Sequence, residues 1–125
     1  MQEADTPDAP EHGIRELLEP DVVDQEEGSV QIMFPVKPEF TIAPGVVQGG
    51  IVAAMLDMAM AMACGEQIST VSMYFEVLRP VSGPQLRVNG NVSKHGRRIV
   101  FAEAEMHDGA GRLVARGRQT AVPIS

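Results

Sequence analysis

The sequence predicts an α+β fold in which one curved antiparallel β-sheet wraps around a single buried helix. Residues 49–64 are rich in Ala, Met and Leu, which favour helices, and they are apolar on every face of that helix. A soluble protein can place such a helix only in its interior. Four strand-like segments follow, and the short turns between them indicate antiparallel neighbours. The length of 125 residues allows one compact domain.

Charge divides the chain into an acidic leader and a mildly basic body. Residues 1–28 contain ten acidic side chains and one arginine, a net charge of −9, whereas the whole chain has 17 acidic and 10 basic residues. The remaining seven acidic and nine basic residues give the rest of the chain a net charge of +2. We expect residues 1–12 to be a flexible leader and residues 13–125 to form the single domain. A basic body of this size favours a small polyanionic ligand over a nucleic acid.

The cysteine content and the apolar segments indicate a cytoplasmic protein. Cys64 is the only cysteine, which excludes an intrachain disulfide and a cysteine-rich zinc site. The amino terminus lacks the apolar core of a signal peptide, and Asp57 interrupts the longest apolar stretch, residues 51–65. We therefore expect no membrane partner. The three histidines lack the spacing of metal ligands, so we expect no metal and no separate cofactor.

Three elements and a loop are predicted before the long helix. Residues 12–19 place apolar side chains on one face at helical spacing and end at a proline, which predicts a short amphipathic helix. Residues 22–26 and 29–36 are candidate strands on either side of Gly28, and apolar and polar side chains alternate in the second. Three prolines in and beside residues 37–45 predict an irregular loop there.

Four strands are predicted after the long helix, over residues 69–79, 85–93, 98–107 and 113–122. Turn residues, mostly glycine and proline, separate them at regular spacing. The simplest arrangement is a meander, in which each strand pairs with the next one along the chain. The predicted order is therefore a hairpin, one buried helix and a four-stranded meander.

Asp57 is the only acidic or basic residue in the apolar helix. Its neighbours three and four positions away are all apolar: Ala53, Ala54, Met60 and Ala61. A lone buried carboxylate is costly unless it is paired or used, and such carboxylates cluster at functional sites. We therefore consider Asp57 a candidate catalytic residue. The alternative is that Asp57 lies on a narrow exposed line of the helix.

The sequence Gln48-Gly49-Gly50 precedes this helix, where backbone N–H groups lack partners and the helix dipole is positive. Such an N–H can donate to a developing oxyanion, although two glycines alone also suit an ordinary turn. Eight residues separate Gly49 from Asp57, about 12 Å of helix. One reacting carbonyl cannot lie within ~3 Å of both residues of a single chain. If both act on one substrate, two chains must share the site, which predicts a dimer.

Residues 45–57 carry a motif in which an acid, Asp57, follows the first of two paired glycines by eight positions. This motif resembles the signature of the PaaI-like hotdog-fold acyl-CoA thioesterases. Residues 111–120 resemble the last strand of that family, and the resemblance extends over residues 14–122. It implies the hotdog fold, hydrolysis of an acyl-CoA substrate to a carboxylic acid and coenzyme A, and a homodimer or homotetramer.

The resemblance also implies roles for individual residues. Asp57 occupies the position of the catalytic carboxylate, acting as nucleophile or general base, and the N–H of Gly49 polarises the thioester carbonyl across the dimer. Thr70 occupies the position of a hydroxyl that orients the acid or a water. Gln48 stands where the family has histidine and Ile42 where it has asparagine; Gln48 can still donate a hydrogen bond, but Ile42 cannot. A non-catalytic acyl-CoA binding module is therefore the alternative function.

A basic turn is predicted between the second and third strands of the meander. Lys94, Arg97 and Arg98 flank Gly96 there and are candidates for holding the phosphates of coenzyme A. The alternative is a solvated basic turn without a ligand. Coenzyme A would then be part of the substrate and not a cofactor of the enzyme.

Overall fold

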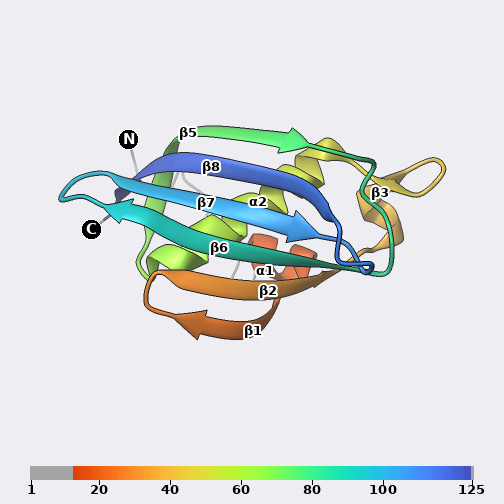
Figure 1. The fold of residues 1–125 in the computed structure, drawn as a ribbon, viewed down its shortest axis with the longest axis horizontal. Helices are drawn as coiled ribbons and strands as arrows, with labels where there is room; N and C mark the ends of the chain where they lie inside the picture. Colours follow the sequence, from red (N-terminus) through yellow and green to blue (C-terminus); the bar gives the residue numbers. More distant parts are fainter. Residues whose placement is uncertain (1–12, 125) are drawn as a thin grey trace, which may run out of the picture.

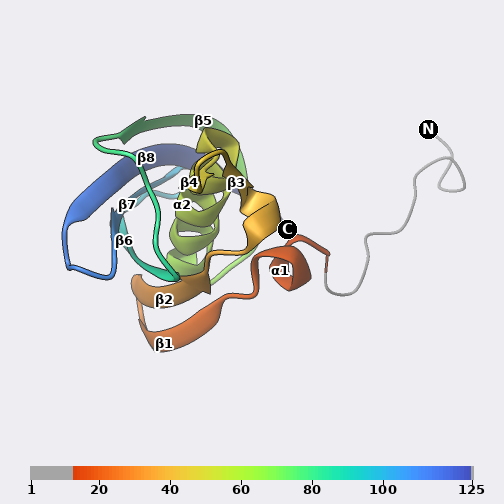
Figure 2. The ribbon, with the colours of Figure 1, turned by 90° about the vertical axis from the view of Figure 1, so that its right-hand side faces the viewer.

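A computed structural model of the protein describes residues 13–124. Six antiparallel strands form one sheet in the order β1-β2-β6-β7-β8-β5, and the helix α2 (Gly49–Cys64) lies in its hollow (Figures 1 and 2). This confirms the predicted α+β hotdog architecture. The predicted leader, residues 1–12, lies outside the described residues, and no described helix is long and apolar enough to cross a membrane.

The elements of the sheet lie close to the predicted ranges. The six strands are β1 (Asp21–Glu26), β2 (Ser29–Pro35), β5 (Ile68–Val77), β6 (Gln85–His95), β7 (Val100–His107) and β8 (Leu113–Pro123). The first predicted helix is present as α1 (Gly13–Leu18). The predicted irregular loop instead contains a short 3-10 helix, η2 (Pro38–Phe40), and the strand β3 (Thr41–Ile42), which pairs with β4 (Val46–Val47).

The meander prediction is wrong for its first strand. β6, β7 and β8 pair in sequence as expected, but β5 pairs with β8 at the far edge of the sheet, and β6 pairs with β2. The connection over residues 78–84 runs past the ends of β8 and β7 (Figure 1). Seven extended residues reach ~23 Å, more than the ~14 Å of three strand spacings. A connection of this length therefore permits a crossing as well as a hairpin.

Helix α2 is the centre of the core, as predicted, but only one side of it is fully buried. The buried side chains are Val52, Met55, Leu56, Ala59, Met60 and Ala63. The helix ends at Gly65, whose φ of 70° places it in the left-handed region. The remaining α2 side chains, Asp57 among them, are half-buried. One flank of α2 is thus left uncovered by the sheet. The prediction that this helix is buried on every face is wrong for that flank.

Gly90 on β6 allows α2 to lie directly against the sheet. A Cβ atom at this position would lie 2.4 Å from the carbonyl oxygen of Ala59, closer than real Cβ contacts. The close approach holds α2 over the middle strands and leaves β5 as an edge strand beyond it. The inward side of β5 consequently carries a large exposed apolar residue, Phe75.

Candidate active site

Asp57 lies in the middle of α2, on the flank that the sheet leaves uncovered. Its side chain is half-buried among the half-buried residues Ala53, Ala54 and Ala61. The Thr70 hydroxyl, at the start of β5, lies 3.2 Å from Asp57 Oδ1, at hydrogen-bond distance. The structure therefore brings together two of the predicted site residues, from α2 and from the edge strand.

Thr70 has a second contact that the sequence analysis missed. Its Oγ1 lies 2.7 Å from Oε1 of Gln119, a residue of β8 that is 3% exposed. The signal for Gln119 was present in the sequence, because it follows Ala115 and Gly117 at alternate positions of the strand. A long amide at an inward-facing position, between small residues, is the kind of exception that marks a polar contact in a core.

The other predicted residues lie at the amino end of α2. Gln48 is the N-cap, and its carbonyl accepts hydrogen bonds from the N–H groups of Ile51 (2.9 Å) and Val52 (3.2 Å). Gly49 is the first helical residue and is exposed, so its own N–H has no partner within the helix. The Gln48 side chain lies over Gly50, two residues further on, since its Oε1 lies 3.1 Å from the Cβ position of Gly50. The amino end of α2 therefore offers a backbone donor that no residue among 13–124 accepts from.

The structure does not bring this donor to Asp57 within one chain. Gly49 and Asp57 are eight residues apart on one continuous helix, which separates them by about 12 Å. Ile42, the residue at the family's asparagine position, lies on β3 and is 57% exposed. The β3–β4 hairpin that carries Ile42 is connected to the start of α2, because the Gln48 N–H donates to the Phe40 carbonyl at 2.9 Å.

The predicted basic turn lies between β6 and β7, near the carboxyl end of α2. Lys94, Arg97 and Arg98 are exposed there, and none of them has an ion-pair partner among residues 13–124. His95 Nε2 lies 3.1 Å from Glu66 Oε1, which ties the turn to the segment that follows α2. Glu66 is nine residues beyond Asp57, about 13 Å along the helix direction. The turn is therefore a peripheral site relative to Asp57.

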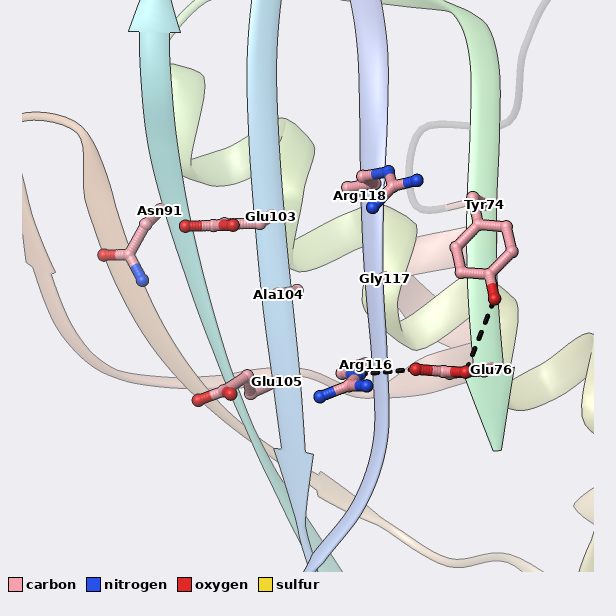
Figure 3. A pocket seen from close by; sticks show the side chains of 9 residues that line it. All are labelled: Tyr74, Glu76, Asn91, Glu103, Ala104, Glu105, Arg116, Gly117 and Arg118. Atoms are coloured by element: carbon pink, nitrogen blue, oxygen red, sulfur yellow. Dashed lines mark hydrogen bonds and ion pairs between the residues drawn. The ribbon is translucent and has the colours of Figure 1, made fainter. Parts of the chain in front are cut away.

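Two arginines of β8 lie on the opposite face of the sheet. Arg116 Nε donates to Glu76 Oε1 at 2.5 Å, and the Arg118 guanidinium lies 5.0 Å from the centre of the Tyr74 ring (Figure 3). These side chains, with Glu103 and Glu105 of β7, line a hollow on the face that points away from α2. This hollow is therefore separate from the surroundings of Asp57.

Cys64 lies at the end of α2 and has the properties of a packing residue. Burial, and after it the nearby negative charge of Glu66, raises the pKa of the Cys64 thiol, so the thiol stays protonated at neutral pH. Its Sγ lies 3.3 Å from the Met60 carbonyl and donates to it. In the part of the chain that the structure describes, no three His, Cys, Asp or Glu side chains are grouped so that they could hold a metal ion.

Comparison with known proteins gives the family of this chain. Residues 44–115, more than half of the chain, match the thioesterase superfamily. The chain belongs to that superfamily. It is 30% identical to human acyl-coenzyme A thioesterase 13 over 100 residues, which are 74% of this chain and 71% of that protein. It is accordingly a thioesterase, a hydrolase that acts on thioesters, as the sequence predicted.

Solved structures place this thioesterase in the same fold. Zebrafish thioesterase superfamily member 2 matches with a TM-score of 0.77 and 26% identity, over 84% of this chain and 81% of that one. The PaaI protein of E. coli, from the phenylacetic acid degradation operon, matches with a TM-score of 0.83 and 21% identity, over 90% and 84%. The likeness to PaaI confirms the predicted hotdog fold, and the match of residues 44–115 confirms the predicted thioesterase family.

Proposed function

We propose that this thioesterase hydrolyses acyl-CoA thioesters, with Asp57 as nucleophile or general base and the Gly49 N–H of a partner chain as oxyanion donor. The observation that carries the proposal is the environment of Asp57. It is the only charged side chain of α2, it is half-buried among alanines, and it contacts the hydroxyl of Thr70. A carboxylate that pairs with no cation among residues 13–124 keeps its negative charge for attack or for accepting a proton. The substrate class is supported by the name of the human relative, an acyl-coenzyme A thioesterase.

The dimer is supported by the apolar surface beside Asp57. β5 is an edge strand, and three of its large apolar side chains are exposed: Val71 (63%), Phe75 (36%) and Val77 (43%). The uncovered flank of α2 adjoins this edge through the Thr70 contact. An open strand edge with exposed apolar side chains favours pairing with another chain. A two-fold pairing along β5 would cover both and set the partner's α2 beside Asp57.

The chemistry requires two groups on either side of the thioester. The Gly49 N–H, supported by the Gln48 amide, would donate to the carbonyl oxygen as it becomes an oxyanion. Asp57 would attack the carbonyl carbon directly, or take a proton from a water molecule that attacks it. In either case the C–S bond breaks and coenzyme A leaves as a thiolate. After direct attack, water hydrolyses the mixed anhydride that joins the acyl group to Asp57, which releases the carboxylic acid and frees Asp57. After attack by water, Asp57 passes the proton it has taken to the thiolate or to solvent. A thiolate is a good leaving group, so a site without histidine has no need of a strong general acid.

The basic turn would hold the other end of the substrate. Lys94, Arg97 and Arg98 are exposed cations without ion-pair partners in residues 13–124, and they lie well away from Asp57. Coenzyme A carries its phosphates at the end opposite the thioester. Contacts to these phosphates would supply affinity without touching the reacting atoms.

Mixing two inactive chains tests the shared site. Gly49→Pro removes the N–H donor and leaves the helix intact, because proline suits the first helical position and Gln48 before it is already extended (φ −64°, ψ 141°). Asp57→Asn removes the carboxylate. Each variant alone should release little thiol from an acyl-CoA. Chains unfolded together and refolded as a 1:1 mixture should recover about a quarter of the parent activity, because half of the dimers are hybrids with one intact site each.

Gly49→Ala is the matched control for this experiment. A Cβ at position 49 meets no atom within 4 Å, and alanine keeps the N–H. This variant should therefore remain active by itself. A mixture that recovers no activity, or an active monomer in sedimentation, would contradict the shared site.

A further inference from the structure

Gln119 is the one buried polar or charged residue among residues 13–124. Its Oε1 lies 2.7 Å from Thr70 Oγ1, and its Nε2 is buried without a hydrogen-bond partner in the described part of the chain. A buried N–H donor without a partner destabilises a fold. The amide therefore needs an explanation beyond packing, and the atom next to it is the hydroxyl that contacts Asp57.

The Thr70 hydroxyl lies between two oxygen atoms. Gln119 Oε1 is 2.7 Å from Thr70 Oγ1 on one side, and Asp57 Oδ1 is 3.2 Å from it on the other. A hydroxyl has one proton, and neither an amide oxygen nor an ionised carboxylate has a proton to give in return. With Oε1 facing Thr70, the hydroxyl can donate its proton to Gln119 or to Asp57, but not to both.

A half turn of the Gln119 amide about its Cγ–Cδ bond resolves this competition. It exchanges Oε1 and Nε2 in the same volume. The Nε2–H then donates to Thr70 Oγ1, and the Thr70 proton is free to point to Asp57 Oδ1. The three residues then form a directional chain of hydrogen bonds, from Gln119 Nε2–H to Thr70 Oγ1 and from the Thr70 O–H to Asp57 Oδ1.

We propose that Gln119 is a positioning residue for Asp57, acting through Thr70. By donating to Thr70 it commits the Thr70 proton to Asp57, which favours the ionised carboxylate and fixes one of its oxygens. Thr70 is the one side chain of residues 13–124 that hydrogen-bonds to Asp57, and no cation pairs with it there. The inference rests on the proposed function, because it concerns the charged form that a nucleophile or base requires.

Packing alone gives no reason for a glutamine at this position. As placed, the Nε2 end of the buried amide has no hydrogen-bond partner in the described part of the chain. Methionine has a similar length and no polar group that needs a partner, so it should pack at least as well. Residues that lower stability in this way are expected at functional sites.

The test compares the parent with Gln119→Met and Gln119→Glu, each alone and combined with Thr70→Val. For each variant, kcat, KM and the pH profile of kcat/KM are measured by thiol release from an acyl-CoA, and Tm by circular dichroism. Gln119→Met should lower kcat about fivefold with little change in KM, because the Thr70 proton is no longer committed. Its Tm should equal or exceed that of the parent.

Gln119→Glu sharpens the test because it places an oxygen where the proposed donor is. On the acid limb of the profile, the pH at which kcat/KM falls to half should be about half a unit higher in Gln119→Met than in the parent. It should be higher still in Gln119→Glu, because the new carboxylate draws the Thr70 proton away from Asp57. Gln119→Met should lose its effect in the Thr70→Val background, because the link to Asp57 is already broken.

A structural role for Gln119 would give a different pattern. Parent-like kcat and acid limb in Gln119→Met, or equal effects of Gln119→Met with and without Thr70→Val, would overturn the proposal. So would a lower Tm with an unchanged acid limb. If Asp57→Asn remains active, the proposed function fails; if Asp57→Asn is inactive and Gln119→Met is parent-like, only the role of Gln119 fails.

Discussion

The strands β5 and β8 present polar side chains to both faces of the sheet, but these side chains have different partners on the two faces. On the outer face the Arg116 guanidinium pairs with the Glu76 carboxylate, so charge meets charge (Figure 3). On the inner face Thr70 and Gln119 are neutral, and Thr70 contacts one half-buried carboxylate, Asp57, which pairs with no cation among residues 13–124. The same pair of strands thus carries an ion pair on its outer face, and on its inner face neutral side chains that lie beside the carboxylate of α2.

This difference separates a structural surface from a reactive one. An exposed ion pair adds little to the free energy of unfolding. Its two charges offset each other, so we expect it to be unreactive. A carboxylate beside apolar groups is poorly solvated, and neutral hydrogen bonds orient it without neutralising it. Substitutions on the two faces should therefore differ more in activity than in stability.

Replacing Asp57 by asparagine should have the largest effect. The amide fills the same volume but cannot attack a carbonyl or accept a proton from water, so turnover of an acyl-CoA should fall at least ~100-fold with little change in Tm. Glu76→Gln is the matched control on the outer face, where the same chemical change should leave turnover within about twofold of the parent. Turnover of Asp57→Asn near that of the parent would remove Asp57 from the mechanism.

Gly90→Ala should have the largest effect on stability. The added Cβ would lie 2.4 Å from the Ala59 carbonyl oxygen, so α2 or β6 must move, at a cost of about 1–3 kcal/mol. Urea unfolding followed by circular dichroism measures the loss. Gly109→Ala, in the turn between β7 and β8, meets no atom within 4 Å and should unfold like the parent. Equal stability of the two variants would show that α2 does not depend on this close approach.

Much of the inner face could be predicted from the sequence. The apolar composition of residues 49–64 predicts the central helix, and the single acid within it identifies Asp57. Both are local properties: composition and helical spacing need no knowledge of the rest of the fold. The paired glycines at the start of the helix are equally local, and the structure confirms that Gly49 lies at the exposed amino end of α2.

The parts that could not be predicted depend on contacts between distant segments. A meander was expected because connection length alone does not distinguish a hairpin from a crossing, and so the placement of β5 beside β8 was missed. Gln119 was missed for the same reason, since it lies 49 residues from Thr70 and meets it only because those two strands pair. The uncovered flank of α2 likewise follows from where the sheet ends.

Replacing both Arg97 and Arg98 by alanine should give a smaller effect, confined to binding. These exposed cations lie far from Asp57, so their contacts with phosphate act equally in the ground state and the transition state. KM for an acyl-CoA should rise about fivefold with kcat nearly unchanged. A thioester that lacks the nucleotide should not respond to the substitutions. Equal weakening of both substrates would assign the turn a structural role.

Removing the outer-face ion pair should give the smallest effect of all. The Arg116 side chain is 53% exposed, so solvent screens its pairing with Glu76, and Arg116→Ala should cost about 0.2–1 kcal/mol of unfolding free energy. The loss should shrink further at 1 M salt, where charge interactions extend only ~3 Å. Because Arg116 points away from α2, turnover of an acyl-CoA should stay at the parent level. A marked loss of turnover without unfolding would show that the outer face takes part in catalysis, and the division between a quiet face and a reactive face would fail.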